Sequence, residues 1–262
     1  MSRQRIWAIV IRHLFSWPRE LEAIAEAFWW PSFDLFIWGL MTTYLNQQHG
    51  VPGFILSFFL GATILWMFVY RAQQEMGLVF LREFWDRNLL NLLATPLTIG
   101  EFFLGTLILG VIKITISALW MFILAWLLFK FELFNLGVLL IPFIINLLVF
   151  GWSMGYVING LVIRFGYRIQ AFVWTLIMMI QPFSAVFYPV ASLPSWMQFV
   201  SRLLPISYIF EGMRQIMSHV QFDLLNLVWA SLLNLIYLGL SITFFNYCYR
   251  KARQIGRIVK FS

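Results

Sequence analysis

Residues 102–129 read FFLGTLILGVIKITISALWMFILAWLLF, and Lys113 is the one charged side chain in this stretch. A helix needs about 20 predominantly apolar residues to cross a hydrocarbon core about 30 Å thick. The stretch is therefore long enough to span a membrane as a helix. Its apolar residues run continuously, without the period of two that is typical of strands in membrane barrels.

The composition of the whole chain agrees with a membrane location. Of the 262 residues, 61% are hydrophobic and 11% are charged, whereas soluble domains average about 25% charged residues. This excludes an ordinary water-soluble protein, and the high aromatic content excludes a disordered one. Cys248 is the lone cysteine, and no Cys/His spacing suggests zinc, so we expect neither an internal disulfide nor a bound metal.

Six apolar runs are long enough to span a membrane as helices. They lie near 28–45, 53–70, 102–129, 137–163, 170–190 and 222–249. We therefore predict a single all-α domain over 1–262, a polytopic membrane protein with six transmembrane helices.

The distribution of Lys and Arg predicts the orientation of these helices. Fourteen of the 18 basic residues lie in alternate connections or at the termini, which by the positive-inside rule are cytoplasmic. The fourteen are Arg3, Arg5, Arg12, Arg19, Arg71, Arg82, Arg87, Arg164, Arg168, Arg250, Lys251, Arg253, Arg257 and Lys260. Both termini are thus predicted in the cytoplasm, and the net charge of +7 is explained by topology and lipid headgroups rather than by nucleic acid.

Two of the segments outside the spans are terminal. Residues 1–27 place apolar side chains at spacings of three and four, which predicts an amphipathic helix on the inner membrane face, with a break at Trp17-Pro18. A simple basic flank is the alternative. The tail 250–262 is interpreted as a basic contact with headgroups.

Residues 71–100 are too polar for a span and too long for a turn. Charged and aromatic side chains alternate with leucines before Pro96, which predicts a short cytoplasmic helix that ends there. Its candidates for contacting a soluble partner are Arg82, Glu83, Trp85, Asp86 and Arg87. A surface helix resting on lipid is the equal alternative.

The connection 186–221 is too apolar for a solvated loop. Its prolines, Pro189, Pro194 and Pro205, suggest two half-helices that enter the outer leaflet and return, closing the outer end of a pathway. The side chains proposed for this outer gate also include Trp196, Tyr208, Glu211 and Arg214. A structural hairpin that caps the bundle is the alternative.

Asp34 and Lys113 are the two ionisable residues that fall well inside predicted spans. An unpaired charge at the centre of a span costs about 2.5–3.5 kcal/mol on insertion scales. The two could pair between the first and third spans, or each could reach the interface or a polar cavity separately.

No catalytic motif appears in the sequence. None of the 16 glycines is followed by Lys, so the chain lacks a P-loop, and no nucleophile, metalloprotease or paired-carboxylate arrangement stands in a span. We therefore expect no enzymatic activity and no cofactor bound by this chain.

Two stretches give the chain a family resemblance. The first is Leu92-Leu93-Ala94-Thr95-Pro96-Leu97, followed by Glu101; the second runs from Tyr188-Pro189 through Pro194-x-Trp196 to Pro205 and Glu211-Gly212-x-Arg214. In this order of segments, the chain resembles the membrane permease subunit of type-2 ABC exporters over nearly its whole length.

The resemblance implies a partnership with separate subunits. Two permease copies, here a homodimer, would form the path in a bacterial or archaeal cytoplasmic membrane, and two ATPase subunits holding ATP and Mg would dock beneath them. The helix in 71–100 would then be the coupling helix, and 186–221 the outer gate. A lipid-linked glycan, a lipid or an amphipathic drug would be exported; a secondary transporter or channel and a non-transporting scaffold are the alternatives.

Overall fold

The computed structural model describes residues 1–49, 53–85, 88, 91, 94–131, 137–218 and 221–254. Over these residues the chain is all-α, as predicted, with no strand. The longer helices are α1 (Arg3–Ser16), α3 (Trp30–His49), α4 (Gly53–Trp85), α6 (Ile99–Phe129), α7 (Leu140–Phe165), α8 (Gln170–Ile180), α9 (Ser195–Leu203), α10 (Pro205–Met217) and α11 (Leu224–Gln254). Short helical segments join them: η1 (Trp17–Arg19), α2 (Leu21–Ile24), η2 (Ala25–Trp29), η4 (Gly166–Ile169), η5 (Gln181–Phe183) and η6 (Val190–Ser192).

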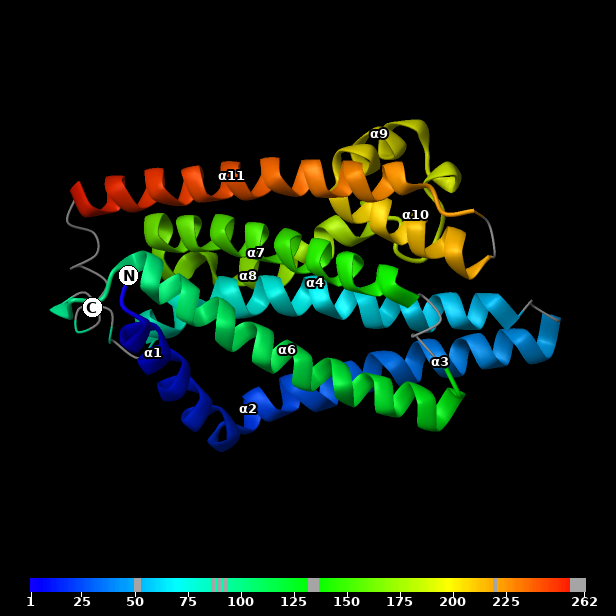
Figure 1. The fold of residues 1–262 in the computed structure, drawn as a ribbon, viewed down its shortest axis with the longest axis horizontal. Coiled ribbons are helices and arrows are strands. Elements are labelled where there is room, and N and C mark those ends of the chain that lie inside the picture. Colours follow the sequence, from blue (N-terminus) through cyan, green and yellow to red (C-terminus); the bar gives the residue numbers. More distant parts are fainter. Residues whose placement is uncertain are drawn as a thin grey trace.

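The long helices lie side by side along the longest axis of the molecule (Figure 1). One end of the bundle, here called the terminal end, holds Met1, the end of α4, the start of α6 and the end of α11. The opposite end, here called the hairpin end, holds the start of α4, the end of α6 and the pair α9–α10.

Three helical stretches are apolar and long enough to cross a membrane: Ile99–Phe129, Gly137–Phe165 and Leu224–Gln254. They confirm the predicted third, fourth and sixth spans. The predicted first and second spans fall on α3 and on the first half of α4. Together these helices make the chain a multi-pass membrane protein, while the count of six crossings stays a prediction.

Helix α4 corrects the prediction for residues 71–85. The expected span ended at Tyr70, but α4 continues without interruption to Trp85, and Arg71, Gln73 and Gln74 are buried in the bundle. The fall in hydropathy at Arg71 therefore marks a change in what surrounds the helix and not the end of the helix. The remainder of the predicted coupling helix falls mostly outside the described residues.

The predicted fifth span, 170–190, is also too long. Helix α8 ends at Ile180, and a 3-10 turn over Gln181–Phe183 follows it. Pro182 lies in that turn and has no backbone N–H to continue an α-helical ladder. The chain turns again at Ala185, which is fully buried and has a positive φ of 52°.

Close packing of α4 against α7 forms the centre of the bundle. A Cβ atom added at Gly155 would lie 2.4 Å from the Met76 Cβ, and one added at Gly151 would lie 2.6 Å from the Ala72 Cβ. The two glycines of Gly151-x-x-x-Gly155 therefore allow the backbones to approach, as small residues do between membrane helices.

The N-terminal segment packs against the bundle instead of lying free. The break predicted at Trp17-Pro18 is confirmed, since α1 ends at Ser16 and the 3-10 turn η1 follows. Ile9 and Val10 are buried, and the Ile9 Cβ would lie 3.0 Å from a Cβ added at Gly105 of α6.

Glu101 ties the start of the chain to the start of α6. Its carboxylate accepts hydrogen bonds from the backbone N–H of Thr98 at 2.9 Å and of Ser2 at 2.6 Å. The Thr98 hydroxyl accepts in return from the Glu101 N–H, which completes a capping box. The Arg5 guanidinium lies 3.6 Å from the same carboxylate.

Candidate functional site

Lys113 pairs with a residue that the sequence analysis did not single out. Its Nζ donates to Oε2 of Glu75 on α4 at 3.0 Å, and the two side chains are 6% and 11% exposed. The considered pair between Asp34 and Lys113 is therefore wrong. The Lys113 ammonium also lies 5.6 Å from the centroid of the Trp17 ring, within reach of a cation–π interaction.

A second ion pair lies one helical turn away on α4. Arg71 Nη1 is 3.8 Å from Glu26 Oε2, and these side chains are 7% and 13% exposed. A small cavity lies between the two pairs, lined in part by Trp17, Arg71, Glu75 and Lys113. The pairs thus join α4 to η2 on one side and to α6 on the other, with each buried charge matched by an opposite one.

Asp34 belongs to neither ion pair and lies on the exposed face of α3. Trp30, Phe33 and Ile37 on the same helix are also exposed. The isolated chain therefore presents a carboxylate within an apolar helical surface, where contact with lipid alone is unfavourable.

At the terminal end, Glu83 faces the interior. It is 2% exposed, and its carboxylate accepts from the Asn88 side-chain amide at 2.7 Å and lies 3.6 Å from Arg12 Nη1 of α1. His13 Nε2 is 3.9 Å from the same carboxylate. Burial, reinforced by the positive charges of Arg12, Lys113 and Arg82, lowers the pKa of His13 to about 4, so His13 is neutral at pH 7 and this contact is not an ion pair.

The other predicted coupling residues are placed differently. Trp85 is 51% exposed at the last turn of α4, and Arg82 is half-buried one turn earlier. Asp86 and Arg87 lie outside the described residues. The structure therefore brings Glu83 to α1 and leaves Arg82 and Trp85 at the surface of the terminal end.

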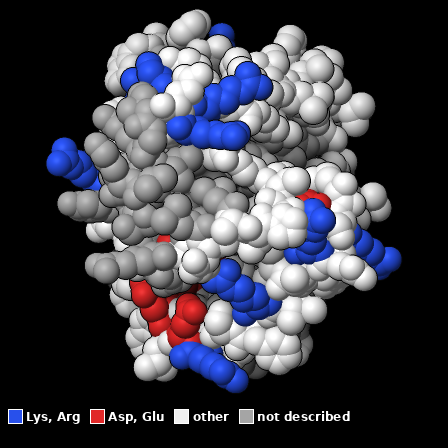
Figure 2. All heavy atoms as spheres, turned by 90° about the vertical axis from the view of Figure 1, so that its left-hand side faces the viewer, with Lys and Arg blue, Asp and Glu red and all other residues white. Residues whose placement is uncertain are grey.

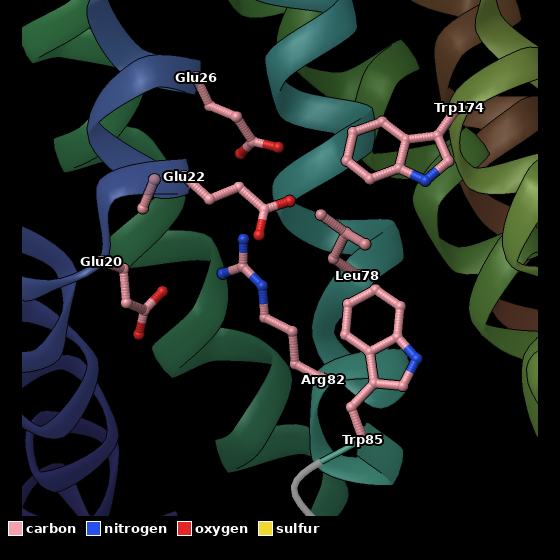
Figure 3. A pocket seen from close by; sticks show the side chains of 8 residues that line it. Glu20, Glu22, Glu26, Leu78, Arg82, Trp85 and Trp174 are labelled. Atoms are coloured by element: carbon pink, nitrogen blue, oxygen red, sulfur yellow. The ribbon is translucent and has the colours of Figure 1, made fainter.

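A cavity of about 180 Å³ opens beside Arg82 and Trp85. Its lining includes Glu20, Glu22, Glu26, Arg82, Trp85 and Trp174, from the N-terminal segment, α4 and α8. In Figure 3 the Arg82 guanidinium points toward Glu20 and Glu22, while both indoles lie on the other side of the cavity. Figure 2, which looks onto the terminal end, shows most of the visible acidic side chains gathered at the lower left, with basic side chains beside them and over the rest of the face.

The two helices predicted in 186–221 are present as α9 and α10, which begin immediately after Pro194 and at Pro205. Their entry into the outer leaflet stays a prediction. Glu211 of α10 connects them to the preceding turn. Its Oε1 accepts from the Val190 N–H, next to Pro189, at 2.6 Å, and its Oε2 lies 2.7 Å from Arg214 Nη1.

Arg214 extends this connection to α8 and α4. Its Nη2 donates to the carbonyl of Ala185, the residue with positive φ, at 2.9 Å. Its guanidinium also lies 4.6 Å from the centroid of the Phe58 ring near the start of α4. Glu211, Arg214 and Phe58 therefore fix the turn after α8 against α4.

Tyr208 and Trp196 do not join this cluster. The Tyr208 hydroxyl donates to the Arg202 carbonyl at 2.9 Å, which closes the turn between α9 and α10. Trp196 is 63% exposed and packs edge-on against Phe183 at 5.9 Å. Of the predicted gate residues, the structure brings together Pro189, Glu211 and Arg214, and it places Pro194, Pro205, Tyr208 and Trp196 in the helical pair itself.

Three charged residues of the buried pairs, Glu26, Arg71 and Glu75, were not among the predicted site residues. A usable signal existed, because Arg71 and Glu75 are four residues apart and lie on one helical face. Apolar residues continue at Met76, Leu78 and Val79, which are buried. Extending the helical period past Tyr70 would have placed both charges inside the bundle.

The fold and the buried charges together define a multi-pass, all-α membrane protein whose apolar helices enclose a small set of ion-paired side chains. A family model described as ABC-2 type transporter matches residues 5–218. The chain therefore belongs to the ABC-2 type transporter family, whose membrane domains are transmembrane subunits that are not catalytic themselves and work with an ATPase subunit. A comparison with curated proteins finds no match.

Proposed function

We propose that this chain is the permease subunit of an ATP-driven exporter that moves its substrate outward by alternating access. ATP and Mg would be held by separate ATPase subunits, two per transporter. The proposed setting is a bacterial or archaeal cytoplasmic membrane, with both termini and the terminal end in the cytoplasm. The proposed substrates are a lipid-linked glycan, a lipid or an amphipathic drug.

The observation that supports this proposal best is the continuity of α4. Helix α4 is 33 residues long, so at 1.5 Å per residue it extends for about 50 Å. Near its start Phe58 contacts Arg214 of the proposed outer gate, and near its end Glu83 contacts Arg12 of α1. One rigid helix can therefore convey a movement at the terminal end to the hairpin end.

In this proposal the ATPase contacts the segment around the end of α4. Exposed Trp85 and half-buried Arg82, with Asp86 and Arg87, would face the ATPase. Glu83 would act through its neighbours, because its buried carboxylate holds Asn88 and Arg12. A push on this segment would then act on α4 and α1 together.

We further propose that two copies form the transport path. The exposed face of α3 supports this arrangement, since Asp34 and the apolar side chains beside it have little cover within one chain. A second copy that covers this face would remove the carboxylate from lipid and offer it polar partners.

Reconstitution into proteoliposomes tests the proposal. The chain would be reconstituted with and without its candidate ATPase, and labelled amphipathic substrates would be followed across the bilayer. We expect outward transport that requires both the ATPase and ATP. Transport by the chain alone would instead support a secondary transporter or channel, and no flux under any condition would support a scaffold.

Variants at the end of α4 test the docking assignment. Asp86→Lys and Arg87→Glu should reduce ATPase co-purification and ATP-dependent transport while leaving membrane insertion intact. Arg202→Glu, which reverses the charge of an exposed residue at the hairpin end, is the matched control and should leave co-purification unchanged. Equal co-purification by all three variants would show that the ATPase docks elsewhere.

A further inference from the structure

The cavity beside Arg82 has two unlike walls. Glu20, Glu22 and Glu26 line it from the N-terminal segment, while the indoles of Trp85 and Trp174 lie opposite them (Figure 3). Leu78 adds an apolar surface to the α4 side. A mixed cavity of this kind offers anionic groups on one side and aromatic and aliphatic surface on the other.

Among the charged residues that line the cavity, together with Arg71, the ion-pair partner of Glu26, acidic side chains outnumber basic ones by one. The three glutamates face two guanidiniums, because Arg82 points into the cavity toward Glu20 and Glu22 and Arg71 pairs with Glu26 at 3.8 Å. In formal charge at neutral pH the group is therefore −1. A ligand that restores neutrality is a monovalent cation.

The indoles of Trp85 and Trp174 favour an organic cation over an inorganic one. Hard cations such as Mg²⁺ and Ca²⁺ require oxygen ligands on all sides, and no group of His, Cys, Asp and Glu that could hold a metal ion occurs among the described residues, the three glutamates included. An organic ammonium group is attracted both to carboxylates and to the faces of Trp rings, as in aromatic cages for quaternary ammonium ligands.

The size and place of the cavity limit the ligand further. A volume of about 180 Å³ equals that of roughly six water molecules in the liquid, enough for a trimethylammonium or small alkylammonium head. Trp174 is the fifth residue of α8 and belongs to the short apolar helical stretch Gln170–Phe183, and Trp side chains are enriched at the headgroup level of membranes. An apolar tail on the ligand could then remain in the lipid.

We propose that this cavity binds an organic ammonium head that carries an apolar tail. Glu22 and its neighbouring carboxylates hold the charge, and Trp174 and Trp85 cover the alkyl groups of the head. Such a group reaches the cavity from one of two sources: an inner-leaflet lipid with an amine headgroup, or a cationic amphiphile from the aqueous phase. Binding here requires no ATPase and is independent of the transport proposal.

Binding of radiolabelled decyltrimethylammonium to the purified full chain in neutral maltoside micelles tests the proposal, with empty micelles subtracted. We expect Trp174→Leu to weaken binding by about 3- to 10-fold and Glu22→Gln by a similar factor, about 3- to 10-fold. Trp174→Phe should retain more affinity than Trp174→Leu, because the aromatic face is kept. Loss of packing alone would affect a neutral decyl probe and the cationic probe alike.

Two matched controls lie far from the cavity at the hairpin end. Asp223→Asn removes the same charge and Trp229→Leu the same ring as the test variants, and both should bind like the wild type. The proposal is overturned if Glu22→Gln and Trp174→Leu also bind like the wild type, or if all variants lose affinity equally.

The source of the ligand is distinguished in nanodiscs. If lipid amines occupy the cavity, the probe should bind more weakly in discs that contain phosphatidylethanolamine than in discs of phosphatidylglycerol alone, and Trp174→Leu should abolish that difference. Equal probe affinity in the two lipids, with the Trp174 dependence retained, would identify water-borne cationic amphiphiles as the ligand.

Discussion

Replacing Lys113 by Met should destabilise the folded chain strongly, because it leaves the Glu75 carboxylate buried without its partner. The Lys113 Nζ and Glu75 Oε2 atoms are 3.0 Å apart, and the carboxylate side chain is 11% exposed. With an effective dielectric constant of 20, the attraction between unit charges at this distance is about 5.5 kcal/mol before desolvation is counted. Removing one partner of a buried pair costs about 3–5 kcal/mol in measured cases.

Thermal unfolding in neutral maltoside micelles measures this loss. For a chain of this size, a loss of that order should lower the midpoint by roughly 6–20 °C. Glu75→Gln should produce a similar loss, since it leaves the Lys113 ammonium unpaired. The double variant Lys113→Met/Glu75→Gln should recover most of the stability, because no uncompensated charge remains.

Asp34 provides the control for this double-mutant cycle. Asp34→Asn should add independently to Lys113→Met, within about 0.5 kcal/mol, since the two residues do not pair. The reasoning is refuted if the losses from Lys113→Met and Glu75→Gln are also strictly additive, or if Asp34→Asn rescues Lys113→Met.

Three further predictions concern packing, capping and pH. Gly155→Ala should reduce the folded yield on size-exclusion chromatography, because the added Cβ would lie 2.4 Å from the Met76 Cβ. Gly239→Ala is the control and should fold normally, since nothing lies within 4 Å of a Cβ added there. Equal yields of the two variants would contradict the close approach of α4 and α7. Glu101→Gln should speed tryptic cleavage near the N-terminus by weakening the tie to Ser2, and an unchanged rate would contradict that role. Because the folded pKa of His13 is about 4 and its ordinary value is 6.5, the unfolded chain binds more protons between these values, so stability should fall as pH falls from about 7 to 4. His13→Gln should flatten that part of the stability curve, and an identical slope in the variant would argue against a buried neutral imidazole.

The local features of the sequence were sufficient for much of the fold. Prolines at 194 and 205 and the Trp17-Pro18 pair act on the backbone at their own positions, and the structure breaks helices there. Continuous apolar runs likewise predicted α6, α7 and α11 to within a few residues. These signals require no knowledge of which segments become neighbours.

The continuation of α4 is visible in the helical period of its apolar residues but not in mean hydropathy. By hydropathy Arg71 and Glu75 look like the start of a polar loop, and their partners, Glu26 and Lys113, are each about 40 residues away in the sequence. Pairing lowers the cost of burying a charge. A polar stretch can therefore continue a membrane helix when distant segments supply opposite charges, and the partners depend on tertiary structure.

The two glycines and the two ion pairs constrain different movements of α4, namely its distance from α7 and its rotation about its own axis. Gly151 and Gly155 set its distance from α7, because no side chain separates the backbones there. The salt bridges of Arg71 and Glu75 fix its rotation about its own axis, since turning the helix would withdraw both charges from η2 and α6 at once. A force on the terminal end of α4 should therefore move the helix together with the N-terminal segment and α6 as one body. That is the mechanical requirement for conveying a movement from the end of α4 to the Arg214 cluster at its start.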